Sequence, residues 1–151
     1  MLIKTVVDFL KPNKRIISNS CYMKSTNEQF DTVVTVEEDI LFINATGIYS
    51  LTNAKDLFKL SIDSALLYSK SKILIDVTGV SGTIPFLDRF EFSEFLSQYK
   101  ARHDLKRKIA VAGQEPIVDK GRFGENVAVN RGANVRVFTD MKEALIWLKN
   151  E

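Results

Sequence analysis

The feature that most constrains the fold is a short apolar run with charged or polar residues on either side. Ile73, Leu74 and Ile75 follow one another within residues 72–77, and residues 108–113 repeat the pattern farther along the chain. Such a run is typical of a strand buried on both faces, which requires packed layers on both sides of the sheet. Each run precedes a helical or loop-and-helix segment, so the chain is predicted to be α/β with a mainly parallel sheet.

Three further strands complete the predicted sheet. Residues 32–37 and 40–49 are rich in β-branched and aromatic residues and flank the acidic tripeptide Glu37-Glu38-Asp39, which predicts an antiparallel hairpin. Residues 134–138 are the last strand. With four helices the predicted order is ββαβαβαβα. This order describes a single mixed, mostly parallel five-stranded sheet with about four helices and right-handed crossovers.

The first two helices are predicted from apolar spacing and end signals. The first begins at Thr52 or Asn53 and has Asp56 in its first turn, where a carboxylate is favoured. The second begins at Pro85, a residue suited to a first helical turn, and reaches about Arg102. The residues expected on their buried faces are Ala54, Leu57, Phe58, Ile62 and Ala65 in the first helix, and Phe92, Phe95, Leu96 and Tyr99 in the second.

The last two helices are shorter. Residues 123–131 form the third, which Gly132 ends. The fourth begins with a capping box, Asp140 to Glu143, and places Trp147 in the core. No linker or repeat divides the elements, so they are predicted to form one domain.

Composition excludes several classes of function. The 21 Lys and Arg against 19 Asp and Glu give a net charge of only +2, which argues against nucleic acid as a partner. The single cysteine, Cys21, and single histidine, His103, predict neither a disulfide nor a metal site, and no cofactor is expected. No apolar stretch approaches the roughly 20 residues that span a bilayer. A cytoplasmic protein is predicted.

The N-terminal segment differs from the rest of the chain. It is predicted as a basic segment over residues 1–30, ahead of a domain over residues 31–151. Two interpretations stay open: the segment is an arm or helix that packs on the domain or on a partner, or Met23 is the true start and the residues before it extend the reading frame.

Several segments resemble the STAS family, in particular its SpoIIAA-like branch. Residues 73–80, Ile-Leu-Ile-Asp-Val-Thr-Gly-Val, are similar to the strand and turn of STAS domains of the anti-sigma-factor-antagonist type. The SpoIIAA-like resemblance is carried by Asp88-Arg89-Phe90-Glu91, residues 108–113, Asn130-Arg131-Gly132, and Val137-Phe138-Thr-Asp140 with Ala144-Leu-Ile-Trp147-Leu148. The resemblance covers about residues 31–151. It implies a compact regulatory module that binds proteins and, in some members, nucleotides or lipids.

One departure from that family concerns its phosphorylated serine. The antagonists carry an Asp-Ser pair after the central strand, whereas this chain has Ser81-Gly-Thr-Ile-Pro85 there. The phosphorylation switch is therefore not transferred. Ser81 and Thr83 are chemically possible substitutes, and the sequence leaves open whether either is modified.

A candidate ligand-binding or regulatory site follows the central strand. Its residues are Asp76, Thr78, Ser81, Gly82, Thr83 and Arg89. Backbone N–H groups before a helix can hold an anion, and Arg89 can add a charge-assisted contact. The alternative is structural: Asp76 accepts hydrogen bonds from the turn at Thr78 and Gly79, and the serine or threonine caps the helix.

A candidate interaction surface lies on the second helix. Phe86 and Phe90 fall well outside its predicted buried face, and exposed aromatic residues indicate a contact surface. The alternative places Phe86 in the preceding loop and Phe90 under a neighbouring segment.

Three functions are ranked from these residues. The first is a non-catalytic regulatory or protein-interaction module with a protein partner or a homodimer. The second is a binding domain for a small anionic or lipid-like ligand, such as a nucleotide, at residues 78–83. An enzyme of unknown class is third, because it needs Asp76 or Glu115 with a perturbed pKa, and the sequence offers neither a Ser-His-Asp set around His103 nor a phosphate loop at residues 121–124.

Overall fold

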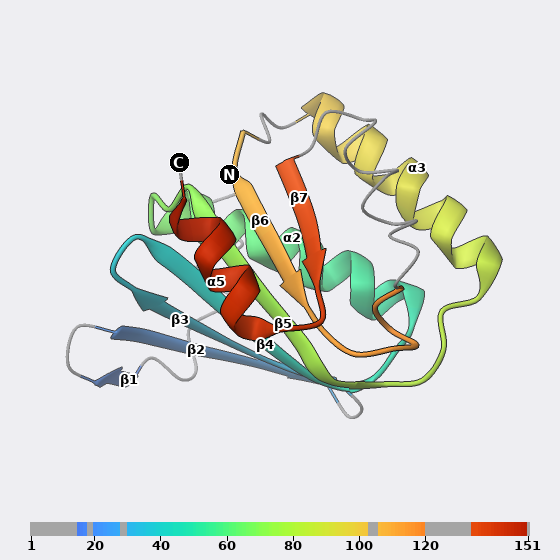
Figure 1. Cartoon of the computed structure of the whole chain (residues 1–151), viewed down its shortest axis with the longest axis horizontal. Coiled ribbons are helices and arrows are strands. Elements are labelled where there is room, and N and C mark those ends of the chain that lie inside the picture. Colours follow the sequence, from blue (N-terminus) through green and yellow to red (C-terminus); the bar gives the residue numbers. More distant parts are fainter. Residues whose placement is uncertain (1–14, 18–19, 28–29, 103–105, 120–133, 151) are drawn as a thin grey trace.

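A computed structural model describes residues 15–17, 20–27, 30–102, 106–119 and 134–150. Its strands form one seven-stranded sheet whose spatial order follows the chain, β1 to β7 (Figure 1). The strands are β1 (Arg15–Ile17), β2 (Ser20–Asn27), β3 (Phe30–Glu37), β4 (Ile40–Ile48), β5 (Lys72–Ser81), β6 (Lys108–Ala112) and β7 (Asn134–Phe138). The described helices are α2 (Leu51–Leu67), α3 (Phe86–Arg102) and α5 (Met141–Lys149).

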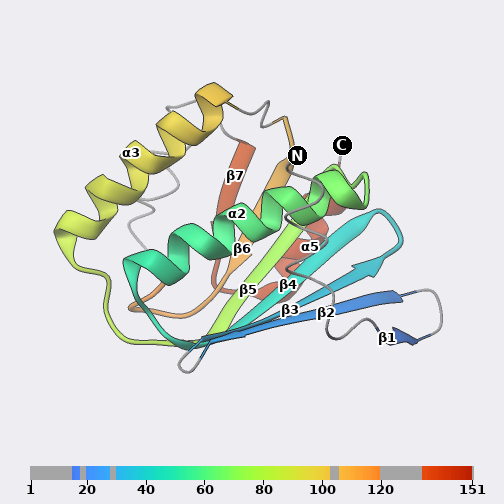
Figure 2. The same cartoon turned by 180° about the vertical axis from the view of Figure 1, so that it is seen from behind.

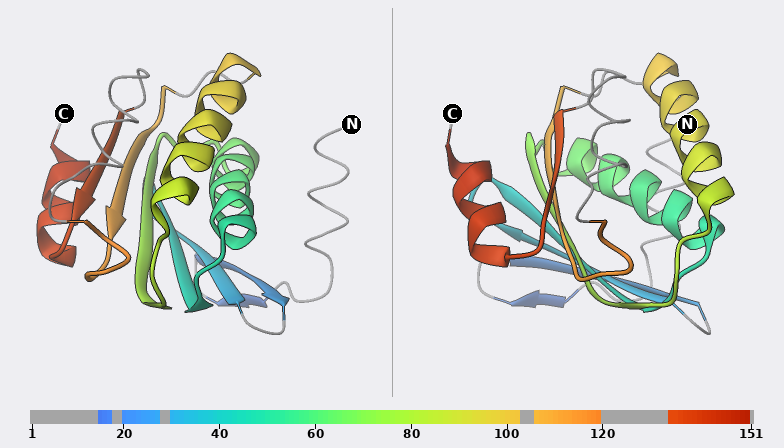
Figure 3. Two further views of the ribbon diagram at one scale, coloured as in Figure 1. Left: turned by 90° about the vertical axis from the view of Figure 1, so that its right-hand side faces the viewer. Right: turned by 45° about the vertical axis from the view of Figure 1, so that its right-hand side comes forward.

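The helices lie in two layers on opposite faces of the sheet. Figure 2 shows α2 and α3 over one face, and the side view in Figure 3 places α5 on the other. The strands β4 to β7 pair in parallel, and the strands β1 to β4 pair antiparallel. The predicted α/β architecture with a mixed, mostly parallel sheet is therefore confirmed, and its five strands are β3 to β7.

Two strands come from the segment predicted to precede the domain. In β2, residues 23–27 pair in register with residues 30–34 of β3, and β1 pairs with the start of β2. This segment thus adds to the sheet beside the predicted hairpin. The domain boundary at residue 31 stays a prediction. The predicted helix over residues 123–131, the motif at residues 121–124 and His103 lie outside the described residues.

The hairpin β3–β4 closes through a two-residue turn without glycine or asparagine. Glu37 pairs with Ile40. Glu38 has a positive φ of 52°, a backbone conformation that residues other than glycine adopt uncommonly. Lysines that precede or begin β5 hold this turn: Lys70 Nζ donates to the Glu38 carbonyl at 2.7 Å, and Lys72 Nζ lies 2.9 Å from Asp39 Oδ2. The acidic composition of the turn is therefore matched by basic residues at the start of the central strand.

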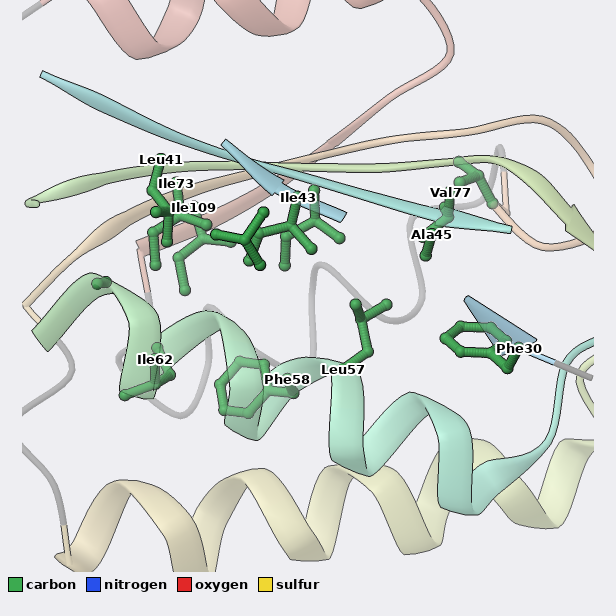
Figure 4. Packing of buried hydrophobic residues seen from close by; sticks show 14 residues of the cluster. Phe30, Leu41, Ile43, Ala45, Leu57, Phe58, Ile62, Ile73, Val77 and Ile109 are labelled. Atoms are coloured by element: carbon green, nitrogen blue, oxygen red, sulfur yellow. The ribbon is translucent and has the colours of Figure 1, made fainter. Parts of the chain in front are cut away.

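The core has one cluster on each face of the sheet. Figure 4 shows Leu41, Ile43 and Ile73 facing α2, from which Leu57 and Ile62 reach them. On the opposite face a second set of buried side chains packs under α5: Ile40, Leu74, Ala110, Ala112, Phe138, Ala144 and Leu148. Because consecutive residues of β5 alternate between the two clusters, the apolar run at residues 73–75 is buried on both faces, as predicted.

The start of α2 differs from the prediction. Ser50, with extended backbone, is the N-cap, and its Oγ accepts a hydrogen bond from the Asn53 N–H at 3.1 Å. The prediction that the helix starts with Thr52 or Asn53 as its N-cap was wrong, because the helix begins at Leu51. This earlier start also places Asp56 beyond the first turn. The Asp140 cap of α5 is confirmed: its Oδ1 accepts from Lys142 N–H at 2.7 Å and Glu143 N–H at 3.2 Å.

Removing β2 is expected to destabilise the fold. A chain that starts at Gln29 lacks the strand, whereas a matched chain that starts at Ser20 keeps it. Five registered residue pairs join residues 23–27 of β2 to β3. At about 1 kcal/mol per hydrogen bond, the shorter chain should lose on the order of 3 kcal/mol of unfolding free energy in urea titrations. Equal stability of the two chains would show that the domain is complete from residue 31.

Candidate functional site

A cavity of about 250 Å³ lies between α2, α3 and the sheet. Its walls are almost wholly apolar. The sheet contributes Ile75, Val77, Ile109 and Val111, and the helices contribute Leu57, Phe58, Phe92 and Leu96, among other residues. The cavity is partly open, since the side chains of Arg89 and Asp119 in its lining are 25% and 35% exposed.

Polar side chains gather at the N-terminal half of α3, where the cavity approaches solvent. The Tyr49 hydroxyl donates to Asp88 Oδ2 at 3.0 Å, and Arg89 Nη1 donates to Asp119 Oδ2 at 2.9 Å. These four residues, all lining the cavity, are called the polar rim. Each pair joins α3 to a loop on the other side of the cavity. The rim thus fixes the N-terminal half of the helix over the cavity.

The C-terminal half of α3 is held by aromatic packing on α2. The Phe58 ring makes edge contacts with Phe92, Phe95 and Tyr99, with ring centroids 5.7 to 6.2 Å apart. The predicted buried face of this helix, including Leu96, is confirmed, since all four residues pack against the larger core cluster. The two halves of α3 are therefore fixed by different forces.

Two tyrosines near this helix hold their protons more tightly than usual. Burial raises the pKa of the Tyr49 phenol, and the hydrogen bond to the Asp88 carboxylate raises it further. Burial, together with the nearby Asp63 carboxylate, raises the pKa of Tyr99 to about 12. Tyr49 therefore acts as a hydrogen-bond donor at the rim throughout the neutral range.

Asp76 has the structural contacts of the alternative interpretation. Its Oδ1 accepts from the Thr78 N–H at 2.9 Å and from the Thr78 hydroxyl at 2.7 Å, and its Oδ2 accepts from Asn44 Nδ2 at 3.0 Å. These bonds lie at an irregularity in the β4–β5 ladder, where residues 76–79 of β5 face residues 44–46 of β4. The side chain therefore ties two neighbouring strands together where β5 carries one extra residue.

The other candidate ligand residues are divided between a strand and a loop. β5 continues past the predicted end at Val77, so Thr78 and Ser81 belong to the strand. The extension exists because β4 is long enough to pair with β5 as far as Ser81. Gly82, with φ of +108°, and Thr83 follow as exposed residues before α3. Anion binding or modification at these residues stays a prediction.

Arg89 has a partner that the sequence analysis did not name. Its guanidinium forms the ion pair with Asp119 and lines the cavity. The structure thus groups Arg89 with the cavity, although contact with an anion at residues 81–83 is still a prediction.

Phe86 and Phe90 lie on the outer side of α3. They are 66% and 52% exposed, and their rings contact each other at 4.9 Å between centroids. Leu87 beside them is 73% exposed and was not predicted. We call these three residues the apolar patch. Its presence on the surface agrees with the predicted geometry, while its use as an interface stays a prediction.

Three residues of the polar rim were missed from the sequence. Tyr49 was placed only as the end of a strand, Asp88 only as part of a family motif, and Asp119 was not singled out. Their sequence separations from their partners are 39 and 30 residues. Only the motif Asp88-Arg89 gave a signal, because adjacent opposite charges at a helix start suggest partners outside the helix.

The described part of the chain lacks two kinds of feature. No group of three His, Cys, Asp or Glu side chains is placed to hold a metal ion there. Within the same residues no helix has both the length and the apolarity needed to cross a bilayer.

The fold has a counterpart among solved structures. The sequence matches no model of a known family and no curated protein. An anti-sigma factor antagonist from Mycobacterium paratuberculosis superposes with a TM-score of 0.56 at 13% identity, over 83% of this chain and 99% of that one. An uncharacterised protein with a SpoIIAA-like fold from Shewanella loihica gives a TM-score of 0.48 at 21% identity, over 82% and 98% of the two chains.

The chain therefore has the STAS/SpoIIAA-like fold of the anti-sigma factor antagonist. The resemblance stated from the sequence is confirmed for the fold.

The tyrosine pKa values predict how stability falls in alkali. The folded chain keeps the Tyr99 proton up to about pH 12, whereas an unfolded tyrosine loses it near 10.0. The contribution of this phenol is thus fully present below pH 10 and is lost as the pH rises from 10 towards 12. In urea titrations across this range, Tyr99→Phe should lose less stability with pH than the unmodified chain. Parallel slopes for both proteins would contradict the shift.

Proposed function

We propose that this chain is a non-catalytic protein-interaction module that binds a partner through the apolar patch on α3. The observation that carries the proposal is the adjacent exposure of Phe86, Leu87 and Phe90 on the first turns of one helix. Burying a large apolar side chain is worth about 1.5 to 3 kcal/mol. Aromatic side chains that project from a helix are a frequent anchor of protein interfaces.

The charges around the patch favour a partner of different sequence over a second copy. Glu94 is exposed on the same helix, as is Glu91, whose Oε2 lies 3.8 Å from Lys55 Nζ, and Asp88 follows Leu87 and bonds to Tyr49 at the cavity. Arg89 forms its ion pair with Asp119, on the cavity side. A symmetric dimer through this patch brings like charges together, which is unfavourable. The patch therefore fits a protein with an apolar pocket and a basic rim.

The fold supports a regulatory role of this kind. One solved structure with the same fold is an anti-sigma factor antagonist, a protein named for its action on another protein. A shared fold does not determine a function by itself, so the proposed function is based on the apolar patch. The polar groups around the cavity and the central strand have mutual hydrogen bonds, such as Tyr49 to Asp88 and Thr78 to Asp76, which suits a structural role better than catalysis.

The test compares patch and control variants. Phe86→Ser/Phe90→Ser removes both rings, and Ile146→Ser removes an apolar side chain that is 61% exposed on α5, on the other side of the sheet. Proteins from the source cells that bind the immobilised chain are quantified for all three forms. A candidate is then purified and titrated by calorimetry. We expect the double variant to weaken binding at least 30-fold, with Ile146→Ser unchanged, and higher salt to weaken binding further.

Two results would contradict the assignment. In the first, the purified partner binds the double variant and the unmodified chain with the same Kd. In the second, light scattering shows a dimer that Phe86→Ser/Phe90→Ser converts to a monomer, which would make a second copy the occupant of the patch.

A further inference from the structure

We propose that the cavity between α2, α3 and the sheet is a binding site for a small, neutral, mainly apolar molecule of about ten heavy atoms that carries one hydroxyl group. The proposal concerns the inner side of α3 and does not depend on the protein interface proposed for its outer side. It also differs from the anion site predicted at residues 78–83.

The walls of the cavity set the apolar character of the ligand. Side chains of Val, Ile, Leu and Phe line it from four strands and both helices. A cavity lined in this way is poorly suited to water, which needs two to four polar partners. An apolar occupant would cover these side chains and stabilise the folded chain by binding to it.

The volume sets the size. An apolar cavity of about 150 Å³ accommodates benzene, which has six heavy atoms. Scaling by volume, the 250 Å³ here suits a molecule of about ten heavy atoms. A two-ring aromatic compound has this size, whereas a long-chain lipid exceeds it.

The polar rim sets the charge and the polar group. Among the described residues at the rim, Asp88 and Asp119 supply two carboxylates and Arg89 supplies one guanidinium. This balance disfavours an anionic ligand, because a carboxylate or phosphate would meet two like charges. A hydroxyl group can donate to either carboxylate or to the Tyr49 phenol oxygen and accept from the Arg89 guanidinium, so it fits both pairs.

The hydrogen-bonded pairs of the rim are partly exposed, so a ligand can reach them. Tyr49 bonds to Asp88 at 3.0 Å, and Arg89 bonds to Asp119 at 2.9 Å, with side chains of the ion pair 25% and 35% exposed. Each partly exposed group keeps capacity for a further hydrogen bond, since a carboxylate accepts several and a guanidinium donates five. A ligand hydroxyl therefore joins the existing pairs without breaking them.

Three matched probes test the chemistry: naphthol, naphthalene and naphthoate. They share one ring system and differ in carrying a hydroxyl, no polar group or a carboxylate. We expect naphthol to raise the Tm of the full chain and to bind with a measurable Kd in calorimetry. Naphthalene should bind several-fold more weakly, and naphthoate at least tenfold more weakly than naphthol. Tyr49→Phe should weaken naphthol several-fold and leave naphthalene unchanged.

Cavity-filling variants test the location. Ala54 lines the cavity from α2, so Ala54→Phe places a ring inside it. Thr52→Phe adds the same ring at an exposed position two residues earlier on the same helix. We expect Ala54→Phe to abolish naphthol binding and Thr52→Phe to retain it. Near-UV circular dichroism checks that each variant is folded, and the smaller Ala54→Leu replaces Ala54→Phe if the larger side chain prevents folding.

Three outcomes would overturn the proposal. Naphthol and naphthalene that leave the Tm unchanged and give no heat of binding would show that the cavity takes no such ligand. Naphthol binding that survives in folded Ala54→Phe or Ala54→Leu would place it elsewhere on the chain. If naphthoate binds as tightly as naphthol, the site accepts an anion, and the proposal of a neutral ligand is refuted.

Discussion

The burial of β5 on both faces is the constraint on which the rest of the structure depends. Ile73 and Ile75 face α2, and Leu74 between them faces the cluster under α5. A strand with this pattern is stable only if each face of the sheet is covered, because either face alone leaves large apolar side chains in water. The parallel neighbours β4 and β6 supply the hydrogen bonds of β5, and the helices that connect or follow these strands supply the covering layers (Figure 3).

The helix α3 completes that covering on one side in an uneven way. Its C-terminal half packs ring against ring on Phe58 of α2, whereas its N-terminal half is joined to its surroundings by the two pairs of the polar rim. Apolar packing excludes water and fills space, while hydrogen-bonded pairs fix position without filling the volume behind them. The cavity lies between the two kinds of contact, with Phe58, Phe92 and Leu96 in its walls and the polar rim beside them. The apolar patch occupies the opposite side of the same helix turns.

The similarity to the anti-sigma factor antagonist illustrates what a fold preserves. At 13% identity few side chains are shared, yet the two structures superpose over most of both chains. The common element is the order of strands and helices and the position of apolar residues within them. The order of the elements does not fix exposed surface groups such as Phe86 and Phe90, on which the proposed function depends. For this chain the proposed protein interface is the apolar patch, and the proposed ligand site is the cavity.

The sequence by itself determined the five strands β3 to β7, the two long helices, the capping of α5 and the buried face of α3. These features depend on contacts between residues that are close along the chain, so their periodicity and end signals were visible. Only the tertiary structure decided that β2 pairs with β3 and that β5 continues through an irregularity to Ser81. It alone also joined Tyr49 to Asp88 and Arg89 to Asp119, because pairs separated by 30 residues or more are set by how the layers pack, which no local pattern records.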